Sequence, residues 1–369
     1  MKGQWIGQYE STNNGTIIVD IDDDGDRYLG YVRLETAQLP GLGAFVRFRT
    51  PDNKSTSYDL KLEVSRMDLF TGKVLTNEDL ATRYPGLKFP TRIDVRMRPD
   101  KDSLTLDWVG DNLVAGAADI PRSKAKQPST LRPERMSWSK FKEYVADLPS
   151  RKFIFRGQEQ PWRLQSKYHR MGRANLDLFL LNDIQALHRN LSARTKHIFN
   201  LTIPDENGAF MHLIQHHGYP TPLLDWSYSP FVAAYFAFRH GGSRPKSRKK
   251  HYCRIFVLDQ RAWRDDFVQI NSIVSFGLHF SIMEFIAIEN ERMIPQQALS
   301  TVTNIDDIES YVLEKQASAK KVYLRAIDIP AEERPLVMKD LQMMGVTAGS
   351  LFPGLDGACE ELQSRFFPN

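Results

Sequence analysis

The chain has 369 residues, of which 41% are hydrophobic and 25% charged, and its formal net charge is +4. These values are typical of a globular protein and exclude extensive disorder. The longest apolar runs, such as 231–238, are too short to cross a bilayer, and no apolar stretch follows the basic start, so neither a membrane span nor a secretory signal is expected. Cys253 and Cys359 match no metal-ligand spacing and favour a cytoplasmic location.

Residues 1–120 have the pattern of a β-rich domain. The β-branched run 15–21 is closed by an acidic turn and returns at 28–34, as in a β-hairpin. Alternation of apolar and polar residues predicts further strands at 44–49, 58–64, 92–97 and 103–108. Short strands without helical periodicity favour an all-β sandwich or barrel, which we expect to act as a regulatory, sensor or target-binding domain.

Residues 121–136 contain three prolines and several charges, which is the composition of a linker. From residue 137 to 369 the pattern changes to α+β, and Ser137 is a candidate cap for a short amphipathic helix. Strands are predicted at 152–156, 223–224, 252–258 and 322–327, and helices at 177–199, 209–216 and 230–238.

Three consecutive residues, Arg156, Gly157 and Gln158, lie where the first of these strands ends. A guanidinium at the end of an apolar strand needs a polar or anionic partner, and its planar set of donors suits a phosphate or carboxylate. Gly157 would allow a ligand to approach the backbone closely. A structural ion pair of Arg156 with a nearby acid explains the pattern equally well.

Two adjacent histidines, His216 and His217, precede the helix-ending Gly218. Neighbouring positions on a helix do not face the same side, so a shared metal site is not expected. We expect one imidazole to pack and the other to line a cleft, where it could exchange protons or donate a hydrogen bond.

The segment Asp225-Trp226-Ser227-Tyr228-Ser229 crowds short polar side chains and an indole before Pro230, which is expected in the first turn of a helix. Asp225, Ser227 and Ser229 are all candidates for capping that helix. Capping needs only one of the three, so the remainder are candidates for a functional site.

Two carboxylates, Glu289 and Glu291, are followed by the paired amides Gln296 and Gln297. On an extended segment the two glutamates would face the same side. A solvated charged turn is the alternative interpretation.

The positive charge lies in the second part of the chain. Lys and Arg number 18 and Asp and Glu 19 in residues 1–130, against 31 and 26 in the remainder. Part of the excess is one basic run, which could contact the phosphates of a nucleic acid or could simply be solvated. Its charged residues are Arg244, Lys246, Arg248, Lys249 and Lys250.

Several of these motifs together resemble the FRG domain, named for Phe-Arg-Gly. The matching segments are Phe155-Arg-Gly-Gln158, the block from His216-His-Gly through Pro-Thr-Pro-Leu-Leu-Asp-Trp-Ser to Pro230, Ala233–Ala237, Asn290–Gln297 and Gly345–Leu355. The resemblance covers roughly residues 137–360 and leaves the β-rich domain outside it.

The order of the motifs also resembles the ADP-ribosyltransferases, whose split β-sheet holds NAD. This resemblance implies that Arg156 binds the phosphates or ribose of NAD, that Ser227 orients the nicotinamide ribose and that Glu291 binds its 2′-hydroxyl. Gln297 is an alternative to Glu291, and His217 or Asp225 would act as the base. The remaining residues implied to contact NAD are Gly157, Gln158, His216, Trp226 and Ser229.

We therefore expect an α+β enzyme that uses NAD as a substrate, needs no metal and modifies a macromolecule, with nucleic acid favoured over protein. The split between a β-rich domain and a catalytic domain would suit a toxin-like or phage-defence enzyme. A non-catalytic module that binds a nucleotide or phosphate-bearing ligand is the alternative, and a metal-independent nuclease using the two histidines is a third. The sequence does not set the oligomeric state.

Overall fold

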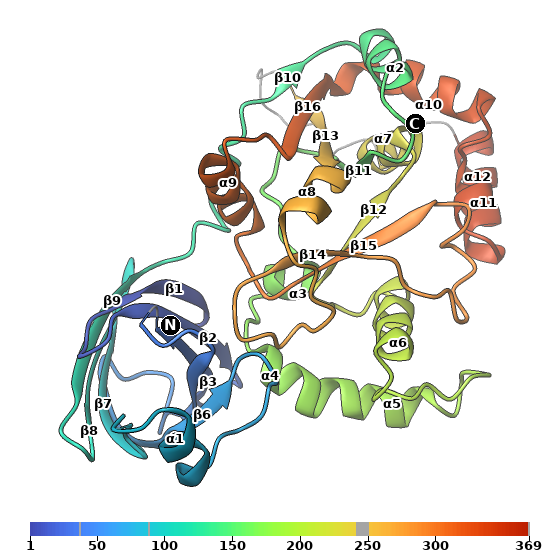
Figure 1. The fold of residues 1–369 in the computed structure, drawn as a ribbon. Helices are drawn as coiled ribbons and strands as arrows, with labels where there is room; N and C mark the ends of the chain where they lie inside the picture. Colours follow the sequence, from blue (N-terminus) through green and yellow to red (C-terminus); the bar gives the residue numbers. More distant parts are fainter. Residues whose placement is uncertain (37, 88, 241–250, 368–369) are drawn as a thin grey trace.

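The computed structural model describes residues 1–36, 38–87, 89–240 and 251–367. The chain folds into a β domain, residues 1–121, and an α+β domain that follows it (Figure 1). The basic run from Arg244 to Lys250 lies outside the described residues. Within the described ranges, no helix combines the length and apolar character needed to cross a membrane.

The β domain consists of two antiparallel sheets and one short helix, α1 (Asn77–Arg83). In spatial order, the first sheet contains β1 (Gly3–Tyr9), β2 (Gly15–Asp23), β3 (Tyr28–Thr36), β4 (Leu42–Arg49) and β6 (Ser65–Asp68). The second contains β5 (Tyr58–Glu63), β7 (Arg92–Pro99), β8 (Ser103–Gly110) and β9 (Ala115–Pro121). Isolated bridges join β1 to the end of the second sheet at Glu10–Ala117 and Trp5–Arg122. The all-β prediction for this region is confirmed.

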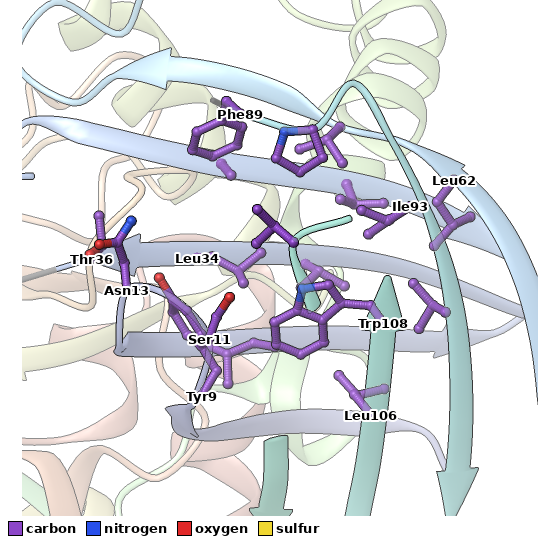
Figure 2. A pocket seen from close by; sticks show the side chains of 18 of the residues that line it. Tyr9, Ser11, Asn13, Leu34, Thr36, Leu62, Phe89, Ile93, Leu106 and Trp108 are labelled. Atoms are coloured by element: carbon purple, nitrogen blue, oxygen red, sulfur yellow. The ribbon is translucent and has the colours of Figure 1, made fainter. Parts of the chain in front are cut away.

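The apolar faces of the two sheets point toward each other, as the period-two pattern predicted. Trp5, Ile17, Val19, Leu104 and Ile120 are among the buried side chains between them. Part of the space between the sheets is not filled by side chains and forms an apolar cavity (Figure 2).

The α+β domain is built on one seven-stranded sheet. Its strands in spatial order are β10 (Glu134–Arg135), β16 (Leu324–Pro330), β13 (Tyr252–Asp259), β11 (Phe153–Gln158), β12 (Leu223–Ser227), β15 (Ala298–Thr303) and β14 (Phe280–Met283). All neighbours are antiparallel except β10 and β16. The central pair, β11 and β12, shares a single ladder position, Phe155 with Ser227. The sheet is therefore nearly divided into two halves at this point.

Helices cover both faces of this sheet. One face packs against α2 (Trp138–Ala146), α7 (Pro230–Phe238), α10 (Arg334–Met343) and α11 (Ala348–Leu351), and α12 (Leu355–Phe366) packs on α11. The other face packs against α8 (Gln260–Asp266) and α9 (Ile308–Ala319). A third apolar cluster gathers α3 (Lys167–Arg170), α4 (Leu176–Leu178), the π-helix Phe179–Ile184 and α6 (Pro204–His216), with α5 (Gln185–Leu191) packed beside it.

Three predicted elements differ clearly from the structure. The helix predicted at 209–216 begins five residues earlier, at Pro204. The helix expected over 177–199 is made of α4, a π-helical turn and α5, and it ends at Leu191 rather than Phe199. The strand expected at 223–224 continues to Ser227, because Asp225 and Ser227 pair with Ser300 and Ala298 of β15 and keep the polar cluster in the ladder.

Residues 121–136, expected to be a linker, connect the domains and pack on the second of them. Two contacts show this packing: Leu131 is buried in the core of the α+β domain, and the Thr130 N–H donates to the carboxylate of Glu309 at 2.6 Å. Glu134 and Arg135 then form the edge strand β10.

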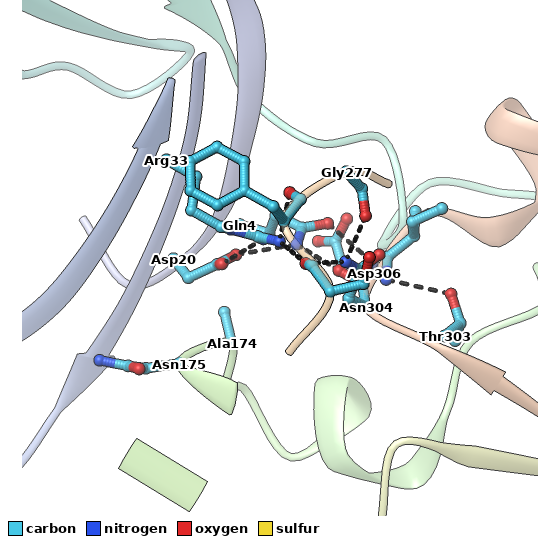
Figure 3. A network of polar contacts seen from close by, with 12 residues as sticks. Gln4, Asp20, Arg33, Ala174, Asn175, Gly277, Thr303, Asn304 and Asp306 are labelled. Atoms are coloured by element: carbon cyan, nitrogen blue, oxygen red, sulfur yellow. Dashed lines mark hydrogen bonds and ion pairs between the residues drawn. The ribbon is translucent and has the colours of Figure 1, made fainter. Parts of the chain in front are cut away.

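A buried polar network joins the two domains (Figure 3). The Gln4 amide nitrogen donates to Asp20 Oδ1 at 2.8 Å and to the Asn304 carbonyl at 2.7 Å. Arg33 pairs with Asp20 at 2.7 Å and also donates to the carbonyls of Ser275 and Phe276. These charges lie within the interface and are paired there, as buried charges must be.

Candidate functional site

A cleft of about 450 Å³ lies where β11 and β12 diverge. It is bounded by the end of α6, by α7 and by the turn that precedes β15. The polar and charged side chains that line it are Arg156, Gln158, Glu159, Arg170, Gln215, His216, Asp225, Ser227, Arg239, His240, Arg292 and Gln296. The structure therefore brings together residues from segments far apart in the chain, among them Arg156, His216 and Asp225, as the sequence predicted.

Arg156 spans the gap between the diverging strands. Its Nη1 donates to the main-chain carbonyl of Asp225 at 2.5 Å, and its Nε is buried with no hydrogen-bond partner among the described residues. Burial lowers the pKa of the guanidinium to about 10, against the attraction of Asp225. Arg156 is therefore cationic at neutral pH and has an unused donor, which is what an anionic ligand requires.

Asp225 provides an ionised carboxylate in the cleft. Its side chain is 52% exposed, lies 3.6 Å from His212 Nε2 and accepts a hydrogen bond from the Gln215 amide. Partial burial opposes ionisation, but His212, Arg156 and Gln215 outweigh it and lower the pKa to about 2. Asp225 is therefore fully charged at physiological pH and cannot act as a general acid there.

His212 was not identified from the sequence, although it is the histidine that contacts Asp225. It is buried in α6, and its Nδ1 lies 3.1 Å from the Asn290 amide nitrogen. If Asn290 donates this hydrogen bond, the remaining proton is on Nε2 and faces the carboxylate. His212 thus contacts Asp225 from α6 and is not itself among the residues that line the cleft.

One of the two adjacent histidines lines the cleft, as expected, but the other is exposed rather than packed. His216 lines the cleft, its Nε2 is buried without a partner among the described residues, and burial together with Arg292 lowers its pKa to about 4. His217 is exposed at the C-cap of α6 and does not line the cleft. Of these two imidazoles, the one that faces the cleft is that of His216, which is neutral at pH 7.

Gly157 lines the cleft, as does Gln158, and it also has a packing role. A Cβ at this position would lie 1.8 Å from the carbonyl oxygen of Ala233 in α7. Glycine therefore allows α7 to pack directly on β11, which sets the position of Arg156 beside it. Gln158 is also structural, because its buried amide donates to the Trp162 carbonyl at 2.9 Å.

The turn after β12 is held by its own polar groups. Ser229 caps α7 by accepting from the Val232 N–H, and Ser227 Oγ donates to the Gln296 carbonyl at 2.7 Å. Trp226 points to the opposite face of the sheet, where its indole donates to Thr301. These contacts fix the turn that follows Asp225, and the hydroxyls of Ser227 and Ser229 both form hydrogen bonds within the protein.

Glu291 and Gln297, the predicted catalytic candidates, are both exposed and do not line the cleft. Of the two interpretations of this segment, the structure has the charged turn: residues 289–297 form successive turns, with positive φ at Glu289 (53°) and Gln297 (46°). The turn instead presents Arg292 and Gln296 to the cleft, and Glu289 accepts a bond from the His197 N–H.

Several cleft residues were missed because they carry no local motif. Arg239 pairs with Glu360, Arg292 lies over the Phe352 ring at 5.3 Å, and Arg170 has its pKa lowered by burial. Trp162, Phe236 and Phe352 add aromatic surface on which a base or nicotinamide ring could stack. Among the described residues, no group of three His, Cys, Asp or Glu side chains could hold a metal ion.

The cleft residues fall largely within one segment that is recognisable by comparison. Residues 151–246 match the FRG domain. The matched segment contains Arg156, His212, His216 and Asp225 and therefore supplies the core of the cleft, whereas Arg292 and Gln296 lie beyond it. Searches of curated proteins and of solved structures found no match to the chain.

Proposed function

We propose that the cleft of the FRG domain binds NAD and that the protein transfers ADP-ribose to a macromolecule, with nucleic acid as the favoured acceptor. The observation that carries this proposal is the pairing, within one cleft, of the cationic Arg156 with the ionised carboxylate of Asp225. A diphosphate needs cationic donors, and breakage of a glycosidic bond needs a nearby negative charge.

The chemistry assigns a role to each group. The bond between ribose C1′ and the nicotinamide nitrogen breaks, and its electron pair leaves with the nicotinamide, which becomes neutral. Positive charge then develops on the ribose, where the Asp225 carboxylate can stabilise it. A nucleophile of the acceptor bonds to C1′ and loses its proton, for which the unprotonated His216 is the available base in the cleft. In this mechanism Asp225 takes the place expected for Glu291.

The shape of the sheet supports the resemblance to ADP-ribosyltransferases. β11 and β12 share one ladder pair and then separate, and Arg156 lies at the separation. A split sheet with an arginine on its first strand and a polar turn before a helix is the arrangement that the resemblance implies. By the same analogy, the β domain would hold the activity in check until a trigger arrives, as in a toxin or defence enzyme.

A second candidate, a module that binds a nucleotide without altering it, is favoured by one observation. Glu291 and Gln297 lie outside the cleft, so neither group that the resemblance assigned to catalysis is in place. The cationic and aromatic side chains would bind a phosphate-bearing ligand in either case.

The two candidates are distinguished by incubating the purified protein with NAD labelled in its ADP-ribose part, alone and with DNA, RNA or cell lysate. Transfer requires both release of nicotinamide and label attached to an acceptor. Binding measured by calorimetry with no release of nicotinamide would favour the module. Absence of both binding and release would contradict both candidates.

A further inference from the structure

The β domain contains a second cavity, of about 130 Å³, between its two sheets (Figure 2). Its wall is formed by aliphatic side chains of β2, β3, β4, β5 and β7, together with the rings of Tyr9, Phe48, Phe89 and Trp108. None of the described residues that line it carries a charge. The cavity therefore differs in chemistry from the cleft of the FRG domain and is separate from the proposed function.

The cavity exists because the side chains that face it do not fill the space between the two sheets. Val32, Leu34, Leu62 and Ile93 pack against the apolar cores of the domain yet remain only partly buried. Protein interiors normally fill such space to crystal-like density, because each missing neighbour forfeits dispersion contacts. An apolar void of this size is consequently a binding site when a molecule of matching shape is present.

Polar groups are confined to one part of the wall. Ser11, Thr12, Asn13 and Thr36 are its polar non-aromatic side chains, and Figure 2 shows Ser11, Asn13 and Thr36 near Tyr9 on one side of the apolar residues. Hydroxyl and amide groups can bond a neutral polar head, whereas a carboxylate or ammonium would find no opposite charge among these residues.

We propose that this cavity binds a small neutral amphiphile, with its hydrocarbon part between the sheets and its polar head beside Ser11, Asn13 and Thr36. The volume limits the hydrocarbon part, because an apolar cavity of roughly 150 Å³ accommodates benzene. A chain or ring of about six carbon atoms is the size that this comparison supports.

The test is calorimetric titration of the full-length protein with 1-hexanol, with benzyl alcohol and hexanoate as comparison probes. The expected result is saturable binding of one hexanol per chain and an upward shift of the thermal unfolding temperature. Hexanoate should bind at least tenfold more weakly than hexanol. Equal or tighter binding of hexanoate would overturn the assignment of a neutral head.

Substitution Val32→Phe fills the cavity and should weaken hexanol binding at least tenfold. Val109→Phe is the matched control, since Val109 is half exposed on β8 and does not line the cavity, and it should bind hexanol as the unaltered protein does. If Val32→Phe does not fold, xenon derivatisation of crystals of the unaltered protein provides the second measurement, with density expected between the two sheets. No saturable binding by any alcohol and no xenon between the sheets would refute the proposal, as would undiminished binding by folded Val32→Phe.

Discussion

The cavity of the β domain and the cleft of the α+β domain are both bounded by strands, yet their linings have opposite chemistry. In the β domain continuous strands alternate strictly, so Ile17, Val19, Val32 and Leu34 all turn inward and no charge among the described residues reaches the cavity. In the FRG domain the ladder between β11 and β12 is interrupted, and Arg156 reaches a main-chain carbonyl across the gap. The interrupted ladder thus leaves room for the side chain of Arg156 between β11 and β12.

The same alternation explains where the charges of the β domain are. Asp20, Asp22 and Arg33 occupy the opposite face of β2 and β3 and form the contact with the second domain. Asp22 accepts from the main-chain N–H groups of Ala174 and Asn175 at 2.7 and 3.1 Å. The strands β2 and β3 therefore line the apolar cavity with one face and form the polar contact with the second domain with the other.

The largest effect on stability is expected from removing the positive charge of Arg33 from the interface between the domains. Arg33→Ala leaves Asp20 buried without its cationic partner and should reduce the free energy of unfolding by about 3–5 kcal/mol, measured by urea denaturation. Arg47→Ala breaks the ion pair of an exposed arginine with Asp177 and should cost at most about 1 kcal/mol. Equal losses in the two variants would show that the network of Figure 3 does not hold the domains together.

Within the cleft, Asp225→Asn removes the negative charge and keeps the shape. The rate of nicotinamide release should fall by about 10²–10³-fold, while the affinity for nucleotide changes little. Glu291→Gln is the control, because this residue is exposed and outside the cleft, and its rate should be unchanged. A large loss in Glu291→Gln with full activity in Asp225→Asn would reverse the assignment of the carboxylate.

Gly157→Ala tests whether the cleft depends on the packing of α7 against β11. The added methyl group would meet the main chain of α7, which cannot move aside as a flexible side chain could, so a loss of about 1–3 kcal/mol in unfolding free energy is expected. Thermal and urea unfolding measure it. An alanine variant of unchanged stability would mean that helix and strand are not in direct contact here.

The remaining prediction concerns the dependence of stability on pH. Burial, with Asp307 and Asp20 nearby, raises the pKa of Asp306 to about 7 in the folded protein, against an unfolded value near 3.8. The folded state therefore binds more protons than the unfolded state between about pH 4 and 7, and this carboxyl makes stability fall as pH rises through that range. Asp306→Asn should remove a slope of up to about 1.4 kcal/mol per pH unit, measured as the difference between the two unfolding curves. Identical slopes would show that Asp306 titrates normally.

Local patterns in the sequence predicted those parts of the fold that depend on near neighbours. Ser229 and Pro230 mark the start of α7, and the run from Phe153 to Arg156 is a buried strand, as expected. The segment around Glu289 forms a charged turn, which was one of its two interpretations, whereas the hydrogen bond that Glu289 accepts from the His197 N–H joins residues far apart in the sequence and has no local signal.

The cleft was predicted only in part for the same reason. Arg156 and Asp225 stood out because they follow apolar strand residues, which is a local signal. His212 lies four residues before His216 on the same helix, so its helical spacing could have placed both imidazoles on one face. Arg170, Arg239 and Arg292 come from three separate segments, and only the folded chain brings them together.

The central claim is that Arg156 makes the charged cleft a nucleotide site, and binding of ADP-ribose measured by calorimetry tests it most directly. ADP-ribose carries the diphosphate and has no nicotinamide to release, so binding is observed without turnover. The protein should bind it at a single site, Arg156→Gln should weaken this affinity at least tenfold, and hexanol binding in the β domain should be unaffected. Equal affinity for ADP-ribose in both proteins, or no binding in either, would contradict the account.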